Sequence, residues 1–160
     1  MRELTVRIRF TKHCLGNCKD RQTTRFMLPR STDGRHVVFP QTWHKQNLKT
    51  AAAILGRHQD EVDKILWDWR VDGRVQRGAW YHRYYGNDNG RKRYCVHESF
   101  YAGQVIGLNC VVPNAITDDD FWRLMALAGT YCGLSPYKPH EWGFYEVESL
   151  QRRRAHTAEE

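Results

Sequence analysis

Residues 104–128, QVIGLNCVVPNAITDDDFWRLMALA, predict a strand that leads into a capped helix. The first part has the period-two pattern of a half-buried strand, with inward side chains at Ile106, Leu108, Cys110 and Val112. Thr117 is the expected N-cap, Asp120 completes a capping box, and the acidic first turn suits the positive end of the helix dipole. Helical spacing then gives one apolar stripe at Phe121, Leu124, Met125 and Ala128.

The same two patterns recur on both sides of this stretch. Alternation predicts strands at 4–10, 65–71 and 144–150, and shorter ones at 24–28 and 36–40. In the 65–71 strand the side chains expected to face inward are Ile65, Trp67, Trp69 and Val71. Pro40 suits the first turn of a helix that Gly56 ends, with an apolar face of Leu48, Ala51, Ala52 and Leu55.

The main elements therefore follow the order strand, helix, strand, strand, helix, strand. That order predicts the α+β class and, within it, a ferredoxin-like sandwich: an antiparallel four-stranded sheet with two helices on one face. We expect residues 1–150 to form this single domain and 151–160 to be a charged, flexible tail. The opposite face of the sheet is expected to stay open.

The chain is basic and rich in aromatic residues. Its formal net charge is +7 and 12% of its residues are aromatic, which suits a polyanionic partner contacted by stacking groups. The alternative is that the basic residues only keep an aromatic core in solution. Five irregularly spaced cysteines, no apolar leader and no apolar run longer than AAAIL favour a reduced, soluble, cytoplasmic protein. We expect no cofactor and no membrane partner.

Basic and aromatic side chains are concentrated between residues 70 and 93. This stretch has seven basic and two acidic residues, with tyrosines between them and the turn sequence GNDNG, so it predicts a hairpin or loop insertion. Arginines supply phosphate contacts and tyrosines supply stacking, the two ingredients of single-strand binding. The candidate contacts are Arg83, Tyr84, Tyr85, Arg91, Lys92 and Arg93. The alternative is a solvated hairpin whose tyrosines fold back on the sheet.

A second candidate is the glycine-rich stretch 128–147, AGTYCGLSPYKPHEWGFYEV. Glycines allow close backbone approach, so amides after Gly133 would face a phosphate, with charge from Lys138 and stacking from Tyr131 or Tyr137. The alternative is that Gly133 caps the second helix and the rest is a turn. A basic track would continue over Arg7, Arg9, Lys45 and Lys49, although such charges are often only solvated.

Two further groups of residues carry chemistry. Cys14 and Cys18, with Cys95 and His97, are metal-ligand candidates, but their spacings differ from the two tight ligand pairs of a structural zinc site. Exposed loop thiols are the preferred interpretation. Should the protein be an enzyme, the candidates for metal-free RNA cleavage are His44, His36 and Tyr84.

The stretch 37–55, VVFPQTWHKQNLKTAAAIL, and the glycine-rich stretch together resemble the repeat-associated (RAMP) RNA-binding proteins of CRISPR effector complexes. The resemblance lies in the strand, proline and helix of the first stretch and in the glycine-rich loop before the final strand. It implies RNA binding and a CRISPR-related setting, and in related RAMP ribonucleases a histidine flanking the first helix acts as base. We expect a compact relative encoded by a virus or mobile element, acting in the host cytoplasm.

The sequence thus predicts non-catalytic binding of single-stranded nucleic acid, with RNA favoured over DNA. One alternative is a metal-independent endoribonuclease. Another is a small anti-defence inhibitor that docks on, or mimics a subunit of, a CRISPR-type or host ribonucleoprotein.

Overall fold

The structure, a computed structural model, describes residues 1–19, 25–75, 80–88, 91–134 and 142–153, with only the backbone described for 83–88 and 91–94. In chain order the elements are β1 (Arg2–Phe10), β2 (Cys14–Leu15), β3 (Cys18–Lys19), β4 (Phe26–Met27), α1 (Gln41–Leu55), the 3₁₀ helix η1 (Val62–Lys64), β5 (Leu66–Asp72), β6 (Trp80–Asp88), β7 (Arg91–Phe100), β8 (Val105–Val112), α2 (Asp118–Tyr131) and β9 (Tyr145–Arg152).

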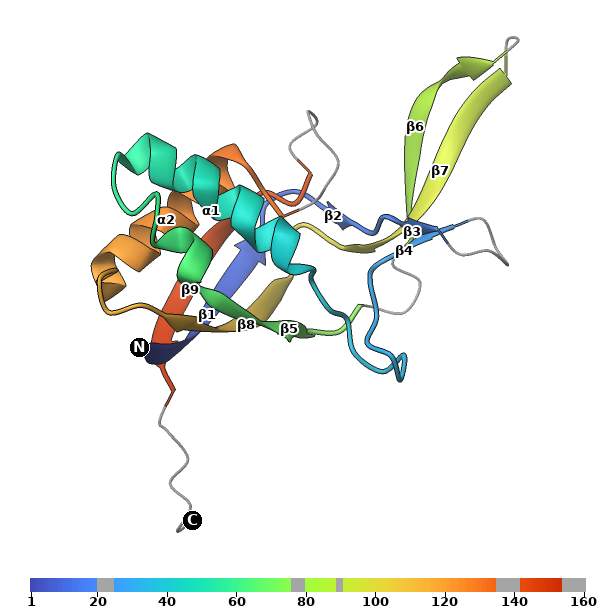
Figure 1. Cartoon of the computed structure of the whole chain (residues 1–160). Coiled ribbons are helices and arrows are strands. Elements are labelled where there is room, and N and C mark those ends of the chain that lie inside the picture. The colour runs from blue at the N-terminus through green and yellow to red at the C-terminus, as the bar shows by residue number, and fades with distance from the viewer. Residues whose placement is uncertain (20–24, 76–79, 89–90, 135–141, 154–160) are drawn as a thin grey trace.

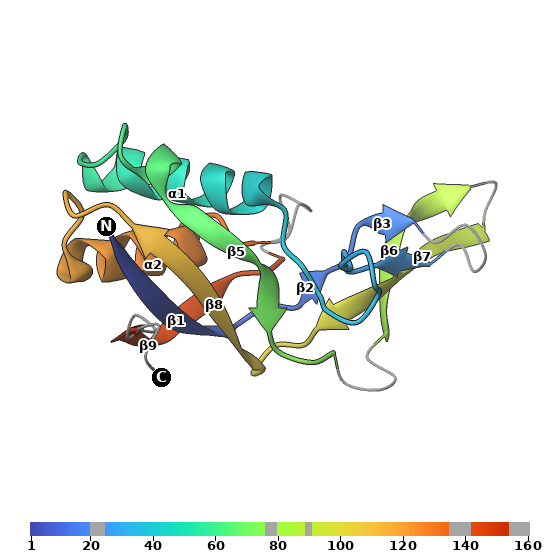
Figure 2. The same cartoon turned by 60° about the horizontal axis from the view of Figure 1, so that its bottom comes forward.

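Four long strands form an antiparallel sheet in the order β5-β8-β1-β9, and both helices pack on one of its faces (Figures 1 and 2). We call this unit the helix-covered sheet. The predicted α+β class is confirmed, and the sequence of strands and helices in this unit agrees with the expected arrangement. β9 continues to Arg152, two residues into the segment predicted as a tail.

The core lies between this sheet and the two helices. The inward sides of β1 and β8 supply fully buried side chains, which are Leu4, Val6, Ile8, Ile106, Leu108 and Val112. The predicted stripe of α2 meets them, since Phe121, Leu124, Met125 and Ala128 are all buried. Burial of such apolar surface is the main favourable contribution to folding.

The helix boundaries follow the predicted caps, with one difference. Pro40 is the N-cap of α1, and Gly56 ends that helix at a φ of 75°. At α2 the Thr117 hydroxyl accepts the Asp120 N–H at 3.1 Å, as expected. The Asp120 carboxylate, however, accepts from His58 at 2.7 Å, so it ties α2 to the end of α1.

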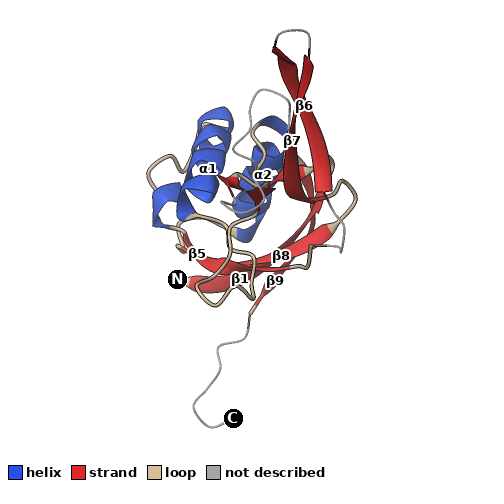
Figure 3. Ribbon diagram, turned by 90° about the vertical axis from the view of Figure 1, so that its right-hand side faces the viewer, coloured by secondary structure: helices blue, strands red, loops and turns tan. Residues whose placement is uncertain are grey.

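A second sheet forms beside the first, in the order β2-β7-β4-β3 with β6 paired to β7. We call it the hairpin sheet, because its longest part is the β6-β7 hairpin, which extends away from the body of the molecule (Figures 1 and 3). Phe10 of β1 stacks on Phe100 of β7 with ring centroids 5.9 Å apart, and this contact joins the two sheets. The basic segment 70–93 was predicted to be a hairpin or a loop, and its described part from residue 80 onward is a hairpin strand pair.

Two local predictions were wrong. Residues 36–40 form no strand and make only isolated bridges, Arg30 with Val37 and Val38 with Arg70. Trp69 is not inward: its exposed fraction is 64%, because a bulge interrupts β5. The predicted 24–28 strand is observed only at β4, and residue 24 lies outside the described ranges. In the part of the chain that is described, no helix is long and apolar enough to cross a membrane.

Candidate nucleic-acid interface

The two predicted nucleic-acid segments meet at four aromatic rings, which we call the junction cluster: His13, Tyr81, Tyr101 and Trp142. Tyr81 stands at the root of the hairpin and Trp142 at the end of the glycine-rich stretch, and their rings are 5.0 Å apart in an edge-on contact. His13 contacts both rings, 5.0 Å from Tyr81 and nearly parallel to Trp142 at 6.3 Å, so the three form a triangle. Such contacts fix the two segments relative to each other.

Hydrogen bonds hold the His13 ring in this position. Its Nδ1 accepts the Ala102 N–H at 2.9 Å, and its carbonyl accepts the Gly143 N–H at 2.8 Å. Partial burial, with a smaller effect of Lys12, lowers the pKa of His13. The ring is therefore neutral at neutral pH, as its acceptor role at Nδ1 requires.

The hairpin presents its basic residues in a fixed backbone register. Its strands pair from Trp80 opposite Glu98 to Asp88 opposite Arg91, with an irregularity between Tyr84 and Gly86. That register places Arg91, Lys92 and Arg93 at the outer end of β7 (Figure 3). The side chains of the predicted contacts Arg83, Tyr84, Tyr85, Arg91, Lys92 and Arg93 lie outside the described part of the structure.

At the glycine-rich stretch the structure supports the capping alternative for Gly133. This residue is buried at a φ of 76°, and its N–H donates to the Ala128 carbonyl at 2.8 Å, which closes α2. A Cβ at this position would meet Phe144 at 2.7 Å and the Trp142 carbonyl oxygen at 2.8 Å. The Gly133 N–H is therefore used within the protein, and residues 135–141, whose amides were also predicted to face a phosphate, lie outside the described ranges. Lys138 and Tyr137 lie outside the described residues, and Tyr131 is exposed on α2.

A buried polar side chain also stabilises the C-terminal end of α2, where Gly133 lies. In the orientation that satisfies its amide, Asn47 donates to the carbonyls of Ala128 and Gly133, each at 3.1 Å, and accepts from the Tyr145 hydroxyl at 2.9 Å. It therefore links α1 to the end of α2 and to β9. Burial raises the pKa of Tyr145, so the hydroxyl keeps the proton that it donates.

The basic residues on the open face of the helix-covered sheet are paired with carboxylates. Arg9 forms ion pairs with Glu146 and, at 2.8 Å, with Glu148, and Arg7 lies 3.5 Å from Asp72. These partners offset the charge that the predicted track would offer to phosphate. Lys45 and Lys49 are exposed on α1, as predicted.

The two catalytic candidates whose side chains are described, His44 and His36, lie in different environments. His44 is only 1% exposed, its ring stacks 4.1 Å from Trp67, and burial lowers its pKa to about 3. Its Nε2 has no hydrogen-bond partner. A neutral ring inside the core cannot reach a phosphate, which corrects its interpretation as a surface histidine. His36 is exposed in the 30–37 loop, and the Tyr84 side chain is not described.

The cysteine candidates are also separated by environment. Cys14 is fully buried in β2, where burial raises the pKa of its thiol, whereas Cys18 is exposed. The interpretation of both as exposed loop thiols was therefore wrong for Cys14. His97 is buried, with its Nδ1 2.7 Å from the Gly16 carbonyl oxygen. Across the described ranges, no three histidine, cysteine or acidic residues are placed to share a metal ion.

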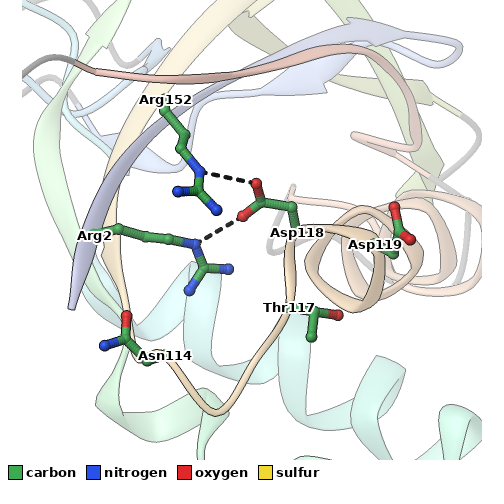
Figure 4. Close-up of a pocket in the computed structure, with 6 residues that line it drawn as sticks. All are labelled: Arg2, Asn114, Thr117, Asp118, Asp119 and Arg152. Atoms are coloured by element: carbon green, nitrogen blue, oxygen red, sulfur yellow. Dashed lines mark hydrogen bonds and ion pairs between the residues drawn. The ribbon is translucent and has the colours of Figure 1, made fainter.

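A hollow at the N-terminus of α2 serves structure rather than anion binding (Figure 4). Asp118 projects into it and is held by the guanidinium of Arg2 at 2.7 Å and that of Arg152 at 3.1 Å. The carboxylate already occupies the place near the helix dipole that an anion would take. This contact fastens β1 and β9 to the start of α2.

Comparison with known proteins gives a match in structure alone. No protein-family model matches the sequence, and no curated protein does. A chain in a cryo-EM structure of the type III-B Cmr-beta bound to cognate target RNA superposes with a TM-score of 0.61 at 9% identity. The likeness is one of fold. It covers 94% of this chain and 60% of the other, so this protein spans about three fifths of that chain's length.

The sequence interpretation named none of the four junction-cluster residues as a contact. Tyr81 lies within the predicted 70–93 segment and Trp142 within the glycine-rich stretch, where other tyrosines drew attention instead. A tryptophan in a stretch rich in turn residues was a usable signal, since such a ring needs apolar neighbours. His13 had no local signal, because its ring partners come from distant parts of the chain.

Proposed function

We propose that this protein binds single-stranded RNA without cleaving it, along the surface formed by the β6-β7 hairpin and the end of the glycine-rich stretch. The observation that carries the proposal is the junction cluster. Because His13 contacts both Tyr81 and Trp142, a strand bound along the hairpin would continue onto the glycine-rich stretch.

Charge supports the same surface. The chain carries a formal net charge of +7, and the 70–93 segment contributes seven basic against two acidic residues. Arg7 and Arg9 are paired with carboxylates, so we assign them a smaller share of phosphate contacts than the hairpin arginines. Lys45, Lys49 and Lys138 remain candidate contacts within this proposal, whereas Gly133 acts as a helix end.

The fold likeness supports RNA as the ligand. The Cmr-beta chain belongs to an assembly that carries target RNA, which agrees with the RAMP resemblance of 37–55 and of the glycine-rich stretch. A ribonucleoprotein is accordingly a second proposed partner. Encoding by a virus stays a prediction, as does a cytoplasmic location.

The test is a set of binding isotherms with fluorescent single-stranded RNA, single-stranded DNA and duplex DNA at two salt concentrations. We expect RNA to bind most tightly and affinity to fall as salt rises, because phosphate contacts release counterions. Equal or tighter binding of duplex DNA, or no binding at all, would contradict the proposal.

The same samples test the enzyme alternative. RNA incubated with the protein in EDTA is expected to keep its length on a denaturing gel, because His44 is buried away from any ligand. Cleavage in EDTA would instead favour the metal-independent ribonuclease and direct attention to His36 and Tyr84.

A further inference from the structure

Trp69 is exposed at a position where the strand pattern places a core residue. Trp67 pairs with Cys110 and Val71 with Leu108, so three residues of β5 stand opposite the single residue Asn109 of β8. The bulge turns the Trp69 side chain outward, to an exposed fraction of 64%. Bulges of this kind often re-aim a side chain at a functional site, and a large exposed ring is unusual enough to need a reason.

The backbone around Trp69 is held firmly. The Asp68 carboxylate accepts the Arg70 N–H at 3.0 Å across the bulge. The Trp69 carbonyl accepts the Phe39 N–H at 2.9 Å, so the 37–39 segment covers this edge of the sheet. The ring therefore stands on a fixed support rather than on a loose loop.

Beside the ring lies a hollow of about 560 Å³, which we call the Trp69 hollow. Its walls include Arg30, Thr32, Val38, Trp67 and Arg70. This volume falls within the range of sites that hold small organic groups. The mixture of indole, valine and arginine surfaces suits a flat ring that carries charge nearby.

A second hollow, of about 610 Å³, shares Arg30 with the first and is lined by Arg35, His36 and Arg74. We call it the Arg35 hollow. Arg30 is fixed between them by Glu98 of β7 at 2.7 Å and by the Leu28 carbonyl at 3.0 Å. Carboxylates line both hollows as well, Asp68 the first and Asp72 the second, and Asp72 lies 3.5 Å from Arg7. Within the described residues no ion pair is formed by Arg35 or Arg74, so the Arg35 hollow keeps two arginines for an anion.

We infer that Trp69 is a stacking platform for one unpaired base of a bound RNA strand, and that the Arg35 hollow receives a phosphate next to that base. The inference rests on the proposed RNA binding and adds a base subsite to it. Stacking requires an open base, which a single strand offers and a duplex does not. Arg30 lines both hollows and pairs with Glu98 of β7, and Glu98 stands opposite Trp80 at the start of β6, so this site adjoins the root of the hairpin.

The test compares RNA affinity of Trp69→Ala with that of Trp122→Ala, a matched change at an exposed tryptophan on α2. Loss of one stacked base is expected to weaken binding by Trp69→Ala about 5- to 150-fold. Trp122→Ala should bind as the wild type does. Melts followed by circular dichroism confirm that both variants are folded.

Three further variants identify the interaction. Trp69→Phe should recover most of the affinity, whereas Trp69→Leu should not, because leucine keeps apolar surface but has no ring. The double change Arg35→Gln and Arg74→Gln should lower the salt slope by about one to two units, while Trp69→Ala leaves that slope unchanged.

The outcomes separate this inference from the proposed function. If hairpin variants weaken RNA binding but folded Trp69→Ala binds as the wild type does, the base subsite is refuted and the proposed function stands. If Trp69→Leu binds RNA as tightly as the wild type does, apolar contact rather than ring stacking supports the binding, and the inference is wrong. If the wild type binds no RNA, the proposed function and the base subsite at Trp69 are both refuted.

Discussion

The helix-covered sheet and the hairpin sheet are built from similar alternating segments, yet they use their charged residues differently. On the open face of the first, Arg7 and Arg9 each lie against a carboxylate. In the second, the hairpin strand β7 places Arg91, Lys92 and Arg93 in succession at its outer end. The formal net charge of +7 therefore does not say which surface offers free positive charge to a phosphate, because that depends on which basic residues are paired with carboxylates. We propose that RNA binds along the hairpin sheet and the adjoining Trp69 edge of β5, whereas the paired arginines on the open face of the helix-covered sheet contribute little to that binding.

The sheets also differ in how they are held together. The helix-covered sheet has long paired strands and a continuous apolar core. The hairpin sheet includes three strands of two residues each and depends on particular contacts such as the stack of Phe26 on His97. Changes in the core of the first sheet should therefore alter stability, whereas changes in the hairpin sheet or at the exposed Trp69 of β5 should alter binding.

Gly133→Val gives the largest expected loss of stability. A valine there is strained at positive φ and overlaps Phe144 and the Trp142 carbonyl, so unfolding should cost about 4 kcal/mol less than in the wild type. The matched control is Gly56→Val, which has the same sign of φ with open space around it and should lose only about 1 to 2 kcal/mol. Urea melts measure both. A stable Gly133→Val protein that fails to bind RNA would instead support the interpretation in which the backbone amides after Gly133 bind a phosphate.

Leu124→Ala should destabilise the helix-covered sheet without changing the RNA surface. The side chain is fully buried, and such truncations cost about 2 to 5 kcal/mol. Arg123→Ala, on the exposed side of the same helix, should stay within about 0.5 kcal/mol of the wild type. Denaturant melts give the stabilities, and isotherms on the folded fraction should show wild-type affinity. Weaker RNA binding by folded Leu124→Ala would break the separation of the two sheets.

His44 should make the stability of the helix-covered sheet depend on pH. Burial lowers its pKa to about 3, so the unfolded chain takes up a proton below about pH 6.5 that the folded protein does not. Stability should fall with pH from about 6.5 downward, at up to about 1.4 kcal/mol per unit from this residue. His44→Leu should flatten the fall between pH 6.5 and 4.5, whereas the exposed control His36→Leu should not. Equal slopes in all three proteins would contradict the account.

Arg9→Gln should have the smallest effect. Its carboxylate partners Glu146 and Glu148 are more than a third exposed, and such surface pairs contribute about 0.2 to 1 kcal/mol. Melts at low and high salt should therefore differ little from the wild type. A loss of several kcal/mol would show that this ion-pair network is part of the framework.

Local patterns were enough to predict most of the helix-covered sheet. The alternation before α2, the Thr117 cap and the Gly56 stop depend only on neighbouring residues, and each was found where the sequence placed it. The burial of His44 could also have been predicted from the sequence, because His44 lies four residues before Leu48 on the apolar stripe of α1. It was missed because a polar residue was assumed to face water.

The remaining features depend on contacts between distant segments. β2, β3 and β4 are too short to leave a pattern and exist through pairing with one another and with β7. The exposure of Trp69 depends on how many residues of β5 stand opposite β8, which alternation within one strand does not encode. The junction cluster likewise forms only once β6 and the glycine-rich stretch are brought beside His13.

The most direct test of the division between the sheets is the salt dependence of RNA affinity in two variants. Changing Arg91, Lys92 and Arg93 together to glutamine should lower the slope of log affinity against log salt by about two units, since each phosphate contact on a single strand contributes about 0.7. Changing Arg7 and Arg9 together to glutamine should leave that slope within about 0.3 of the wild type. An unchanged slope in the hairpin variant, or a larger loss in the Arg7 and Arg9 variant, would contradict the assignment of RNA binding to the hairpin sheet.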